Sequence, residues 1–249
     1  MKWSIPWLPL DTARRPSVSY LGFNTKKPPF DNPTVRRAFA AATDRSVIVA
    51  LIEKYQPERE AREAYTLTPP ETLGRDLTGD VGIPYDPQRA KELLVEAGYT
   101  DVASFPTVTI FARASGAGEY PGLPLLIIEA VADSWREVLG IEVIVAATNE
   151  RVSDRMASEP PDAFRFGAWA ADYNDPDNFI GELFNPDGDY GGEYNYGQFS
   201  DPTFEALVNQ AAGSNRPEAR QLLYIQAEQL LVEDQAAIIP LYFAVYNIP

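Results

Sequence analysis

The chain of 249 residues can bury a substantial core, and its hydrophobic fraction of 45% is typical of a globular protein. It carries 36 acidic and 21 basic side chains, a formal net charge of −15, and most of the acidic excess lies in residues 150–249. This balance argues against nucleic-acid binding, because phosphate neutralisation needs Lys and Arg, and it favours cationic ligands or simple solubility. The sequence has no cysteine and no histidine, which excludes disulfides, thiolate nucleophiles, imidazole acid–base chemistry and the usual zinc sites.

The first residues, MKWSIPWLPLD, are apolar but contain two prolines and no small-residue cleavage pattern. They are therefore not expected to form a signal peptide. No later apolar run is long enough to predict a membrane-spanning helix. We expect a soluble chain, and the sequence predicts no cofactor and no metal site.

Asx-Pro pairs are the most regular punctuation along the chain. An Asx side chain accepts hydrogen bonds from the free N–H groups of a first helical turn, and proline at the first helical position loses only an N–H without a partner. Each pair therefore predicts the start of a helix. The pairs are Asn32-Pro33, Asp86-Pro87, Asp175-Pro176 and Asp201-Pro202.

Glycines mark where three of the predicted helices end. Gly98, Gly140 and Gly213 each follow an apolar stripe at helical spacing, where a left-handed residue is expected. A longer amphipathic helix is predicted from Pro217 to Val232.

Segments rich in β-branched and aromatic residues lie between these helices and predict strands. Strands that alternate with helices indicate an α/β sheet covered by helices. There is no internal repeat and no long linker, so residues 1–249 are expected to form a single domain. The predicted strands are Ser19–Asn24, Thr107–Ala112, Glu142–Ala147, Ala163–Ala170 and Ile238–Phe243.

The stretch GAWAADYNDPDNFIGELF, residues 167–184, runs from a strand through three aspartates into a helix. Asp175 precedes Pro176 and is expected to be an N-cap. Asp177 falls in the first turn, where a solvated negative charge complements the helix dipole. Asn178 is expected to be ordinary first-turn surface.

Asp172 is required by neither the strand before it nor the cap after it. In an open α/β sheet, ligands gather where strands end and helices begin, so its carboxylate could receive a cation. The alternative is a loop aspartate that closes an Asx-turn through Asn174. The residues themselves leave both readings open.

Trp169 is predicted to lie on the same strand face as Arg165, with Gly167 between them. The glycine would leave room for a flat ligand or for close packing. A tryptophan on a strand packs in a core more often than it binds ligand. Arg165 is expected to pair with an acidic neighbour or with the anionic end of a ligand.

The segment YLGFNTKKPPFDNPTVRRAFAAATDRSVIV, residues 20–49, resembles the signature of the family 5 extracellular solute-binding proteins, the oligopeptide- and dipeptide-binding receptors of ABC importers. Further segments follow in the order expected for that family: YDPQRAKELLVEAGY (85–99), WREVLGIEV (135–143), WAADYNDPDNF (169–179), FSDPTFEALV (199–208) and IIPLYF (238–243). The signature residues carried by the first segment are Asn24, Thr25, Pro29, Phe30, Asp31, Val35, Arg36, Ala38, Asp44 and Arg45.

The resemblance implies an α/β fold with a mixed sheet flanked by helices, like the second lobe of a type II periplasmic-binding-protein-like (cluster C) fold. Such receptors are about twice as long, and two lobes clamp the ligand. This chain resembles only the C-terminal lobe, so Met1 would mark a truncation and the N-terminal lobe would be a missing partner. The implied function is non-enzymatic and extracytoplasmic, capturing peptides for ABC permease subunits.

The resemblance also implies roles for individual residues. In peptide-binding members, the aspartate of the Trp-x-x-Asp-Tyr segment pairs with the α-ammonium of the ligand, and the tryptophan lines a side-chain pocket. These roles carry onto Asp172 and Trp169, with Tyr173 beside them. Arg165 is the nearest candidate for the ligand carboxylate, although its spacing does not match a family position, while the residue 20–49 signature is expected to be structural.

Three alternatives remain on the sequence. The same fold could bind an oligosaccharide or a nickel chelate, with Trp169 stacking and Asp172 accepting hydroxyl hydrogen bonds. A carboxylate-dependent hydrolase could use Asp172 with Asp175. Calcium could bind the oxygen-rich segments DYNDPDNF (172–179) and NPDGDYGGE (185–193), but neither has the spacing of an EF-hand loop.

Overall fold

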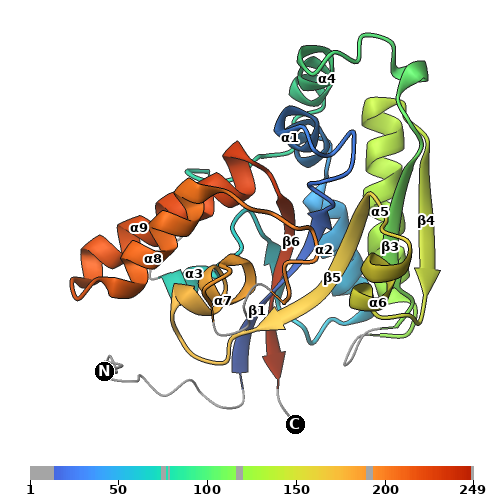
Figure 1. Cartoon of the computed structure of the whole chain (residues 1–249). Coiled ribbons are helices and arrows are strands. Elements are labelled where there is room, and N and C mark those ends of the chain that lie inside the picture. Colours follow the sequence, from blue (N-terminus) through green and yellow to red (C-terminus); the bar gives the residue numbers. More distant parts are fainter. Residues whose placement is uncertain (1–13, 74–76, 78, 116–119, 189–192, 248–249) are drawn as a thin grey trace.

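The computed structural model describes residues 14–73, 77, 79–115, 120–188 and 193–247. Within these residues, six strands form one sheet in the order β2-β6-β1-β5-β3-β4 (Figure 1). β1 pairs antiparallel with β5 and β6, and β2 pairs antiparallel with β6, whereas β3 runs parallel to β4 and β5. The sheet is therefore mixed, as the resemblance implied.

All five predicted strands are present, with bounds that differ from the prediction by a few residues. The additional strand, β2, has only three residues and pairs with β6 at one edge of the sheet, so its pattern was too short to be predicted. The strands are β1 (Arg14–Phe23), β2 (Ala61–Glu63), β3 (Val108–Arg113), β4 (Val143–Thr148), β5 (Ala163–Ala170) and β6 (Ile238–Asn247).

The four Asx-Pro pairs begin helical segments as predicted, because each Asx side chain accepts at least one backbone N–H of the turn that follows. The α-helices are α1 (Pro33–Ala41), α2 (Arg45–Tyr55), α3 (Pro70–Leu73), α4 (Pro87–Glu96), α5 (Leu123–Leu139), α6 (Val152–Ser158), α7 (Gly181–Phe184), α8 (Pro202–Gly213) and α9 (Pro217–Gln229). Two 3₁₀ turns, η1 (Val102–Ser104) and η2 (Pro176–Asn178), and a π-helical turn, η3 (Leu230–Asp234), complete the described elements.

Two of the three predicted helix-ending glycines adopt the left-handed conformation, Gly98 with φ of 99° and Gly140 with φ of 71°. The prediction for Gly213 is wrong. Gly213 is the last helical residue of α8, and Ser214 after it is extended, with φ of −83° and ψ of 129°. The chain leaves α8 in an extended direction toward α9, so no left-handed turn is needed there.

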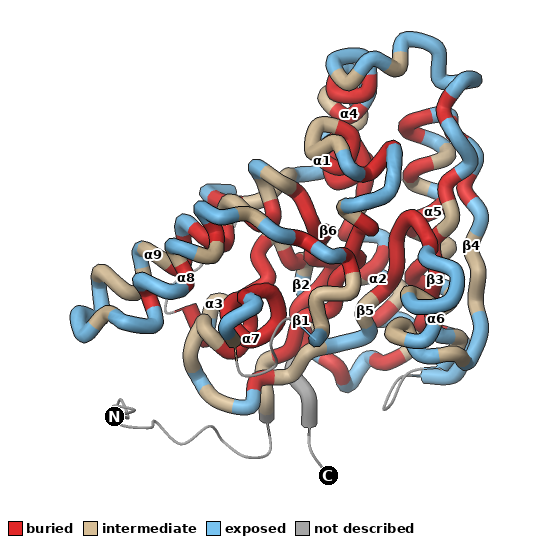
Figure 2. Tube along the Cα trace, viewed as in Figure 1, coloured by how far each residue is buried: buried red, intermediate tan, exposed pale blue. Residues whose placement is uncertain are grey.

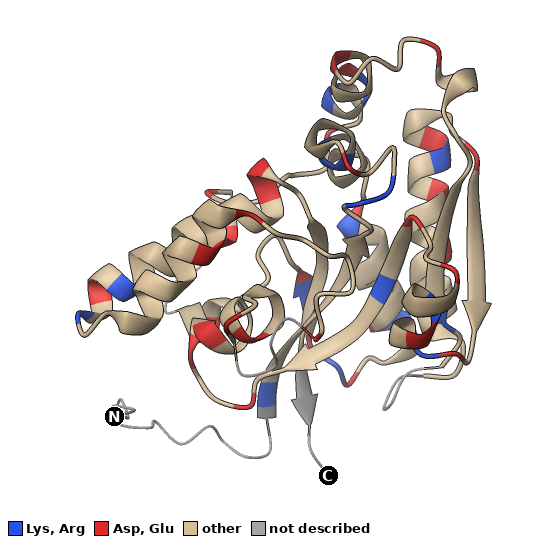
Figure 3. Cartoon of the chain, in the orientation of Figure 1, with Lys and Arg blue, Asp and Glu red and all other residues tan. Residues whose placement is uncertain are grey.

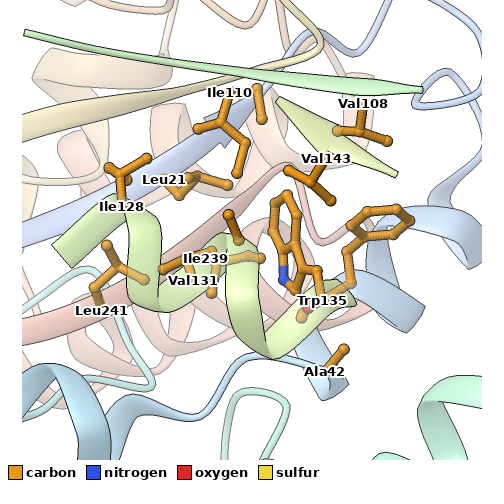
Figure 4. Close-up of a cluster of buried hydrophobic side chains, with 14 of the residues drawn as sticks. Leu21, Ala42, Val108, Ile110, Ile128, Val131, Trp135, Val143, Ile239 and Leu241 are labelled. Carbon is orange, nitrogen blue, oxygen red and sulfur yellow. Dashed lines mark hydrogen bonds between the residues drawn. The ribbon is translucent and has the colours of Figure 1, made fainter. Parts of the chain in front are cut away.

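Hydrophobic side chains form one core on each face of the sheet. The buried positions along the chain are red in Figure 2. The first face is covered by helices α1, α2, α4 and α5 (Figure 1). The second face is covered by α8, α9 and the segment from η2 to α7. In the first core, Trp135 on α5 is fully buried among apolar side chains such as Val131 and Val143 (Figure 4). Its indole N–H donates to the Phe39 carbonyl at 3.1 Å and to the Thr43 hydroxyl at 2.9 Å. Burial on both faces makes the sheet a rigid platform for the loops at its edges.

The signature at residues 20–49 has the structural roles that were expected. Buried Arg36 donates to the carbonyls of Phe30 at 2.6 Å and Gln235 at 2.8 Å. Asp44 caps α2 by accepting the N–H of Ser46 at 3.0 Å. Arg36 thus joins α1 to the turn before β6, whereas Asp44 acts within its own helix start. No helix among the described residues is long and apolar enough to cross a membrane.

Candidate functional site

A β-bulge shapes the end of β5, where the candidate residues lie. Val18 of β1 faces Trp169, but Tyr20 faces Phe166, so Gly167 and Ala168 lie opposite a single residue of β1. A bulge of this kind breaks the alternation of side chains between the two faces and bends the strand. Gly167 and Ala168 are both exposed, and a Cβ atom on Gly167 would have no heavy atom within 4 Å.

The bulge places Trp169 and Arg165 on opposite faces of the sheet, so the prediction of a shared face is wrong. Trp169 packs against the second core, and its ring lies 5.3 Å from that of Tyr194, tilted by 60°. Arg165 is buried toward the first core, where its Nη2 donates to the Tyr242 hydroxyl at 3.1 Å. Arg165 therefore does not share a face with Trp169, and its pairing with an acidic neighbour or with the anionic end of a ligand stays a prediction.

Asp172 lies just beyond β5 with 51% of its side chain exposed. One carboxylate oxygen is 3.4 Å from Nη1 of Arg15 on β1, a long ion pair between two partly exposed groups. Such a pair is worth about 0–1 kcal/mol, so it leaves the carboxylate available. Among the described hydrogen bonds, none joins this side chain to Asn174 as the Asx-turn alternative required.

Asn178 corrects a second prediction, because it is buried with only 1% of its surface exposed. Its Oδ1 accepts the indole N–H of Trp169 at 3.2 Å and the backbone N–H of Asp172 at 3.0 Å. The 3₁₀ turn of η2 directs this side chain inward, under the loop, instead of toward solvent. A continuous α-helix assumed from the sequence does not reveal that direction.

Asp175 and Asp177 anchor the loop after β5 to helix α9. Asp175 caps η2 by accepting the N–H of Asp177 at 2.9 Å, as predicted, and also forms an ion pair of 2.7 Å with Arg220 of α9. Asp177 is half-buried and accepts the hydroxyl of Tyr224 at 2.8 Å, so the prediction of a solvated charge is wrong. Burial, followed by the nearby Asp177 charge, raises the pKa of Tyr224, which keeps this hydroxyl protonated as a donor.

Tyr173 is half-buried, and its hydroxyl points into this acidic network rather than outward. It lies 3.0 Å from Oε1 of Glu182 and 3.4 Å from Oδ2 of Asp177. Burial and then the charges of these two carboxylates raise the Tyr173 pKa. Figure 3 shows the acidic positions on the loop after β5 and on α7 to α9.

A hollow of about 140 Å³ opens between β1, β2, β6 and α3, but Asp172 does not line it. Its charged residues are partly paired with one another, since Arg62 Nη2 lies 2.5 Å from Glu71 Oε1. Ser17, which lines it, pairs with Ala170 on the neighbouring strand, close to the candidate residues. Asp172 thus stands on an open rim and not inside this hollow.

The described residues contain no group of three or more acidic side chains arranged to hold a metal ion. Part of the oxygen-rich segment at 185–193 lies outside the described residues. The N-terminal stretch MKWSIPWLPLD, which is not expected to form a signal peptide, lies outside them as well.

Comparison with known proteins identifies the family. The family model described as bacterial extracellular solute-binding proteins, family 5 Middle, matches residues 4–191. The chain therefore belongs to the family 5 extracellular solute-binding proteins, as the sequence resemblance indicated.

Individual relatives give the same result. The chain is 33% identical over 234 residues to heme-binding protein A of Haemophilus influenzae, covering 92% of this chain and 40% of that protein. It is 29% identical over 232 residues to the periplasmic oligopeptide-binding protein OppA of Escherichia coli, covering 91% and 39%. The chain thus spans about two fifths of the length of these curated relatives.

A solved structure of similar extent shares the fold. It is described as a peptide ABC transporter, peptide-binding protein, and superposes with a TM-score of 0.70 at 26% identity, covering 92% of this chain and 99% of that one. The mixed sheet flanked by helices is therefore the fold of family 5 periplasmic binding proteins. These relatives are described as binding proteins.

Proposed function

We propose that this chain is the C-terminal ligand-binding lobe, over residues 1–249, of an extracytoplasmic receptor that captures peptides for an ABC importer. Asp172 binds the α-ammonium of the peptide, and Trp169 contacts the first part of the ligand. The chain has no catalytic role in this proposal. Its partners are a second, N-terminal lobe and the permease subunits.

The position of the Asp172 carboxylate carries this proposal. It is half-exposed, its ion pair with Arg15 is 3.4 Å long, and its backbone N–H is held by the side-chain amide of buried Asn178. A carboxylate that is fixed but weakly paired can form a charge-assisted hydrogen bond with an ammonium, worth about 1.5–3 kcal/mol. Trp169 lies three residues away and contributes an aromatic surface whose ring is only partly buried.

The open rim supports the need for a second lobe. Peptide binders surround their ligand and satisfy its backbone groups, which one exposed surface cannot do. The relatives are more than twice as long as the part that this chain covers. The first residues of β1 and the last residues of β6 lie at the same end of the sheet as the last residues of β5 (Figure 1). A lobe joined through β1 and β6 would therefore face Asp172.

The hydrolase alternative has less support. Its second carboxylate, Asp175, is occupied by the η2 cap and by Arg220. The oligosaccharide and nickel-chelate alternatives keep the same rim and change only the ligand. Binding measurements with these ligands distinguish them from a peptide receptor.

Calorimetry on the full-length receptor tests the ammonium contact with trialanine and N-acetyl-trialanine as ligands. Asp172→Asn should weaken trialanine binding about 10- to 100-fold, the equivalent of the charge-assisted bond. The acetylated peptide has no ammonium charge, so it should bind weakly to the wild type and equally weakly to the variant.

Asp133→Asn is the matched control, because Asp133 is also an exposed aspartate paired with an arginine, on α5. It should leave trialanine affinity unchanged. Wild-type affinity for trialanine in the Asp172→Asn receptor would contradict the proposal. Binding of an oligosaccharide or a nickel chelate in place of either peptide would transfer the function to one of the alternatives.

A further inference from the structure

We propose that Asn178 is a positioning residue that holds Asp172 and Trp169 together as one unit. The consequence for ligand affinity rests on the proposed function, whereas the positioning itself does not. Nothing in the sequence pattern distinguishes Asn178 from an ordinary surface residue of a first helical turn. Only its contacts in the fold single it out.

The hydrogen bonds of Asn178 determine the orientation of its amide group. The indole N–H of Trp169 and the backbone N–H of Asp172 can only donate, so the side-chain oxygen, and not the nitrogen, must face them. One oxygen thus accepts from both candidate binding residues. Because Asn178 is 1% exposed, water does not readily replace these bonds when the side chain is removed.

The two contacts act on different features of the site. The bond to the Asp172 backbone N–H fixes the position of the backbone from which the carboxylate side chain extends. The bond to Trp169 fixes the rotation of the ring, which also packs against the ring of Tyr194. Residues at binding sites depend on such supporting hydrogen bonds to keep a productive geometry. Losing Asn178 would therefore loosen the anchor and the aromatic surface at the same time.

α9 supports Asn178 from behind through the two acidic residues of the η2 turn. Arg220 pairs with Asp175 at 2.7 Å, and Tyr224 donates to Asp177 at 2.8 Å. Arg220 also donates to the Ala211 carbonyl at 2.8 Å, which ties the turn to the end of α8. The turn that carries Asn178 is thus anchored to the second core independently of any ligand.

Hydrogen exchange measured by NMR on the present chain tests the positioning without a ligand. In the wild type, the indole N–H of Trp169 and the amide of Asp172 should both exchange well below their intrinsic rates. Asn178→Ala should accelerate both at least about tenfold, as expected when a hydrogen-bonded amide becomes free to open locally. Asn178→Asp, which keeps the accepting oxygen, should restore protection.

Asn185→Ala is the matched control. Asn185 is also a buried asparagine, 5% exposed, but its amide bonds Asn209 and not the binding residues. It should leave both exchange rates unchanged. If Asn178→Ala does not fold, Trp169→Phe still decides, because of the two donors it removes only the indole N–H, and the Asp172 amide should remain protected by Asn178. Exchange of the two wild-type groups at intrinsic rates would overturn the inference.

Trialanine affinity of the full-length receptor tests the consequence for binding. Asn178→Ala should weaken binding about tenfold, and this loss should shrink to less than about threefold in the Asp172→Asn background, because residues that act through one another are not additive. An equal loss in both backgrounds would indicate a merely structural effect. Wild-type affinity of Asp172→Asn itself would overturn the proposed function and leave the exchange result standing.

Discussion

Glu228 is a fully buried carboxylate on α9 that holds the loop before α3. It accepts the backbone N–H of Leu67, the backbone N–H of Thr68 at 3.2 Å and the Thr68 hydroxyl at 2.6 Å. Burial raises the pKa of Glu228 from 4.5 to about 7, and the hydrogen bonds from Thr68 and Leu67 oppose this shift only in part. The folded chain therefore binds a proton at this residue more tightly than the unfolded chain does.

This shift predicts a pH-dependent stability with a defined sign. Below pH 4.5 both states are protonated, and between 4.5 and about 7 only the folded state holds the proton, so the free energy of unfolding falls as the pH rises. Glu228→Gln should remove this fall, which is on the order of 2 kcal/mol between pH 5 and 8. Urea unfolding at both pH values measures it.

The control for this prediction is Glu218→Gln, an exposed glutamate on the same helix. It should reproduce the pH dependence of the wild type. A constant difference in unfolding free energy between wild type and Glu228→Gln across the pH range would show that Glu228 does not titrate as proposed.

At the scale of elements, the caps and the bulge act in different ways. The caps begin helices through contacts between residues two or three apart, so each depends on its own few residues. The bulge in β5 depends on pairing with β1, a strand almost 150 residues earlier in the chain. It reverses the face on which Trp169 lies and turns the chain toward the Asp172 loop.

The cap of α8 gives an element-scale prediction. Asp201 accepts the N–H groups of Thr203 at 2.8 Å and Phe204 at 3.1 Å. Asp201→Ala should lower the free energy of unfolding by about 1 kcal/mol, because these donors lose their partner at the helix start. Asp201→Asn keeps a capping oxygen and should lose much less. Equal losses in the two variants, measured by urea unfolding, would contradict a capping role.

At the scale of the whole molecule, two hydrophobic cores cover the two faces of the sheet, and the candidate site lies on the rim beyond β5. At this rim the Asp172 side chain is 51% exposed, and neither Asp172 nor Trp169 lines the hollow of about 140 Å³ beside α3. Under the proposed function, affinity comes from closing two surfaces on the ligand and excluding water from the contacts between them.

The present chain alone should therefore bind trialanine weakly or not measurably. The ammonium contact by itself contributes about 1.5–3 kcal/mol, whereas a micromolar dissociation constant corresponds to about 8 kcal/mol. Calorimetry on this chain checks the expectation, with the full-length receptor as the positive control. Micromolar binding by the chain alone would show that this lobe supplies a complete site.

Local sequence was sufficient for much of the fold. Asx-Pro pairs predicted four helical starts, and runs of β-branched and aromatic residues predicted five of the six described strands. Asp172 and Trp169 were proposed from the sequence as binding residues, through the family resemblance and the position of Asp172 beyond a strand, and their role stays a prediction. These features depend on side chains that act on their own turn or strand, so they leave a readable pattern.

The tertiary structure alone decided how the site is arranged. The β5 bulge separated Arg165 from Trp169, and the inward turn of η2 made Asn178 a buried support. Both depend on pairing and packing with β1 and α9, which are far away along the chain. A residue's neighbours in sequence determine its local conformation, but the face it presents and its burial are set by contacts that only the folded chain makes.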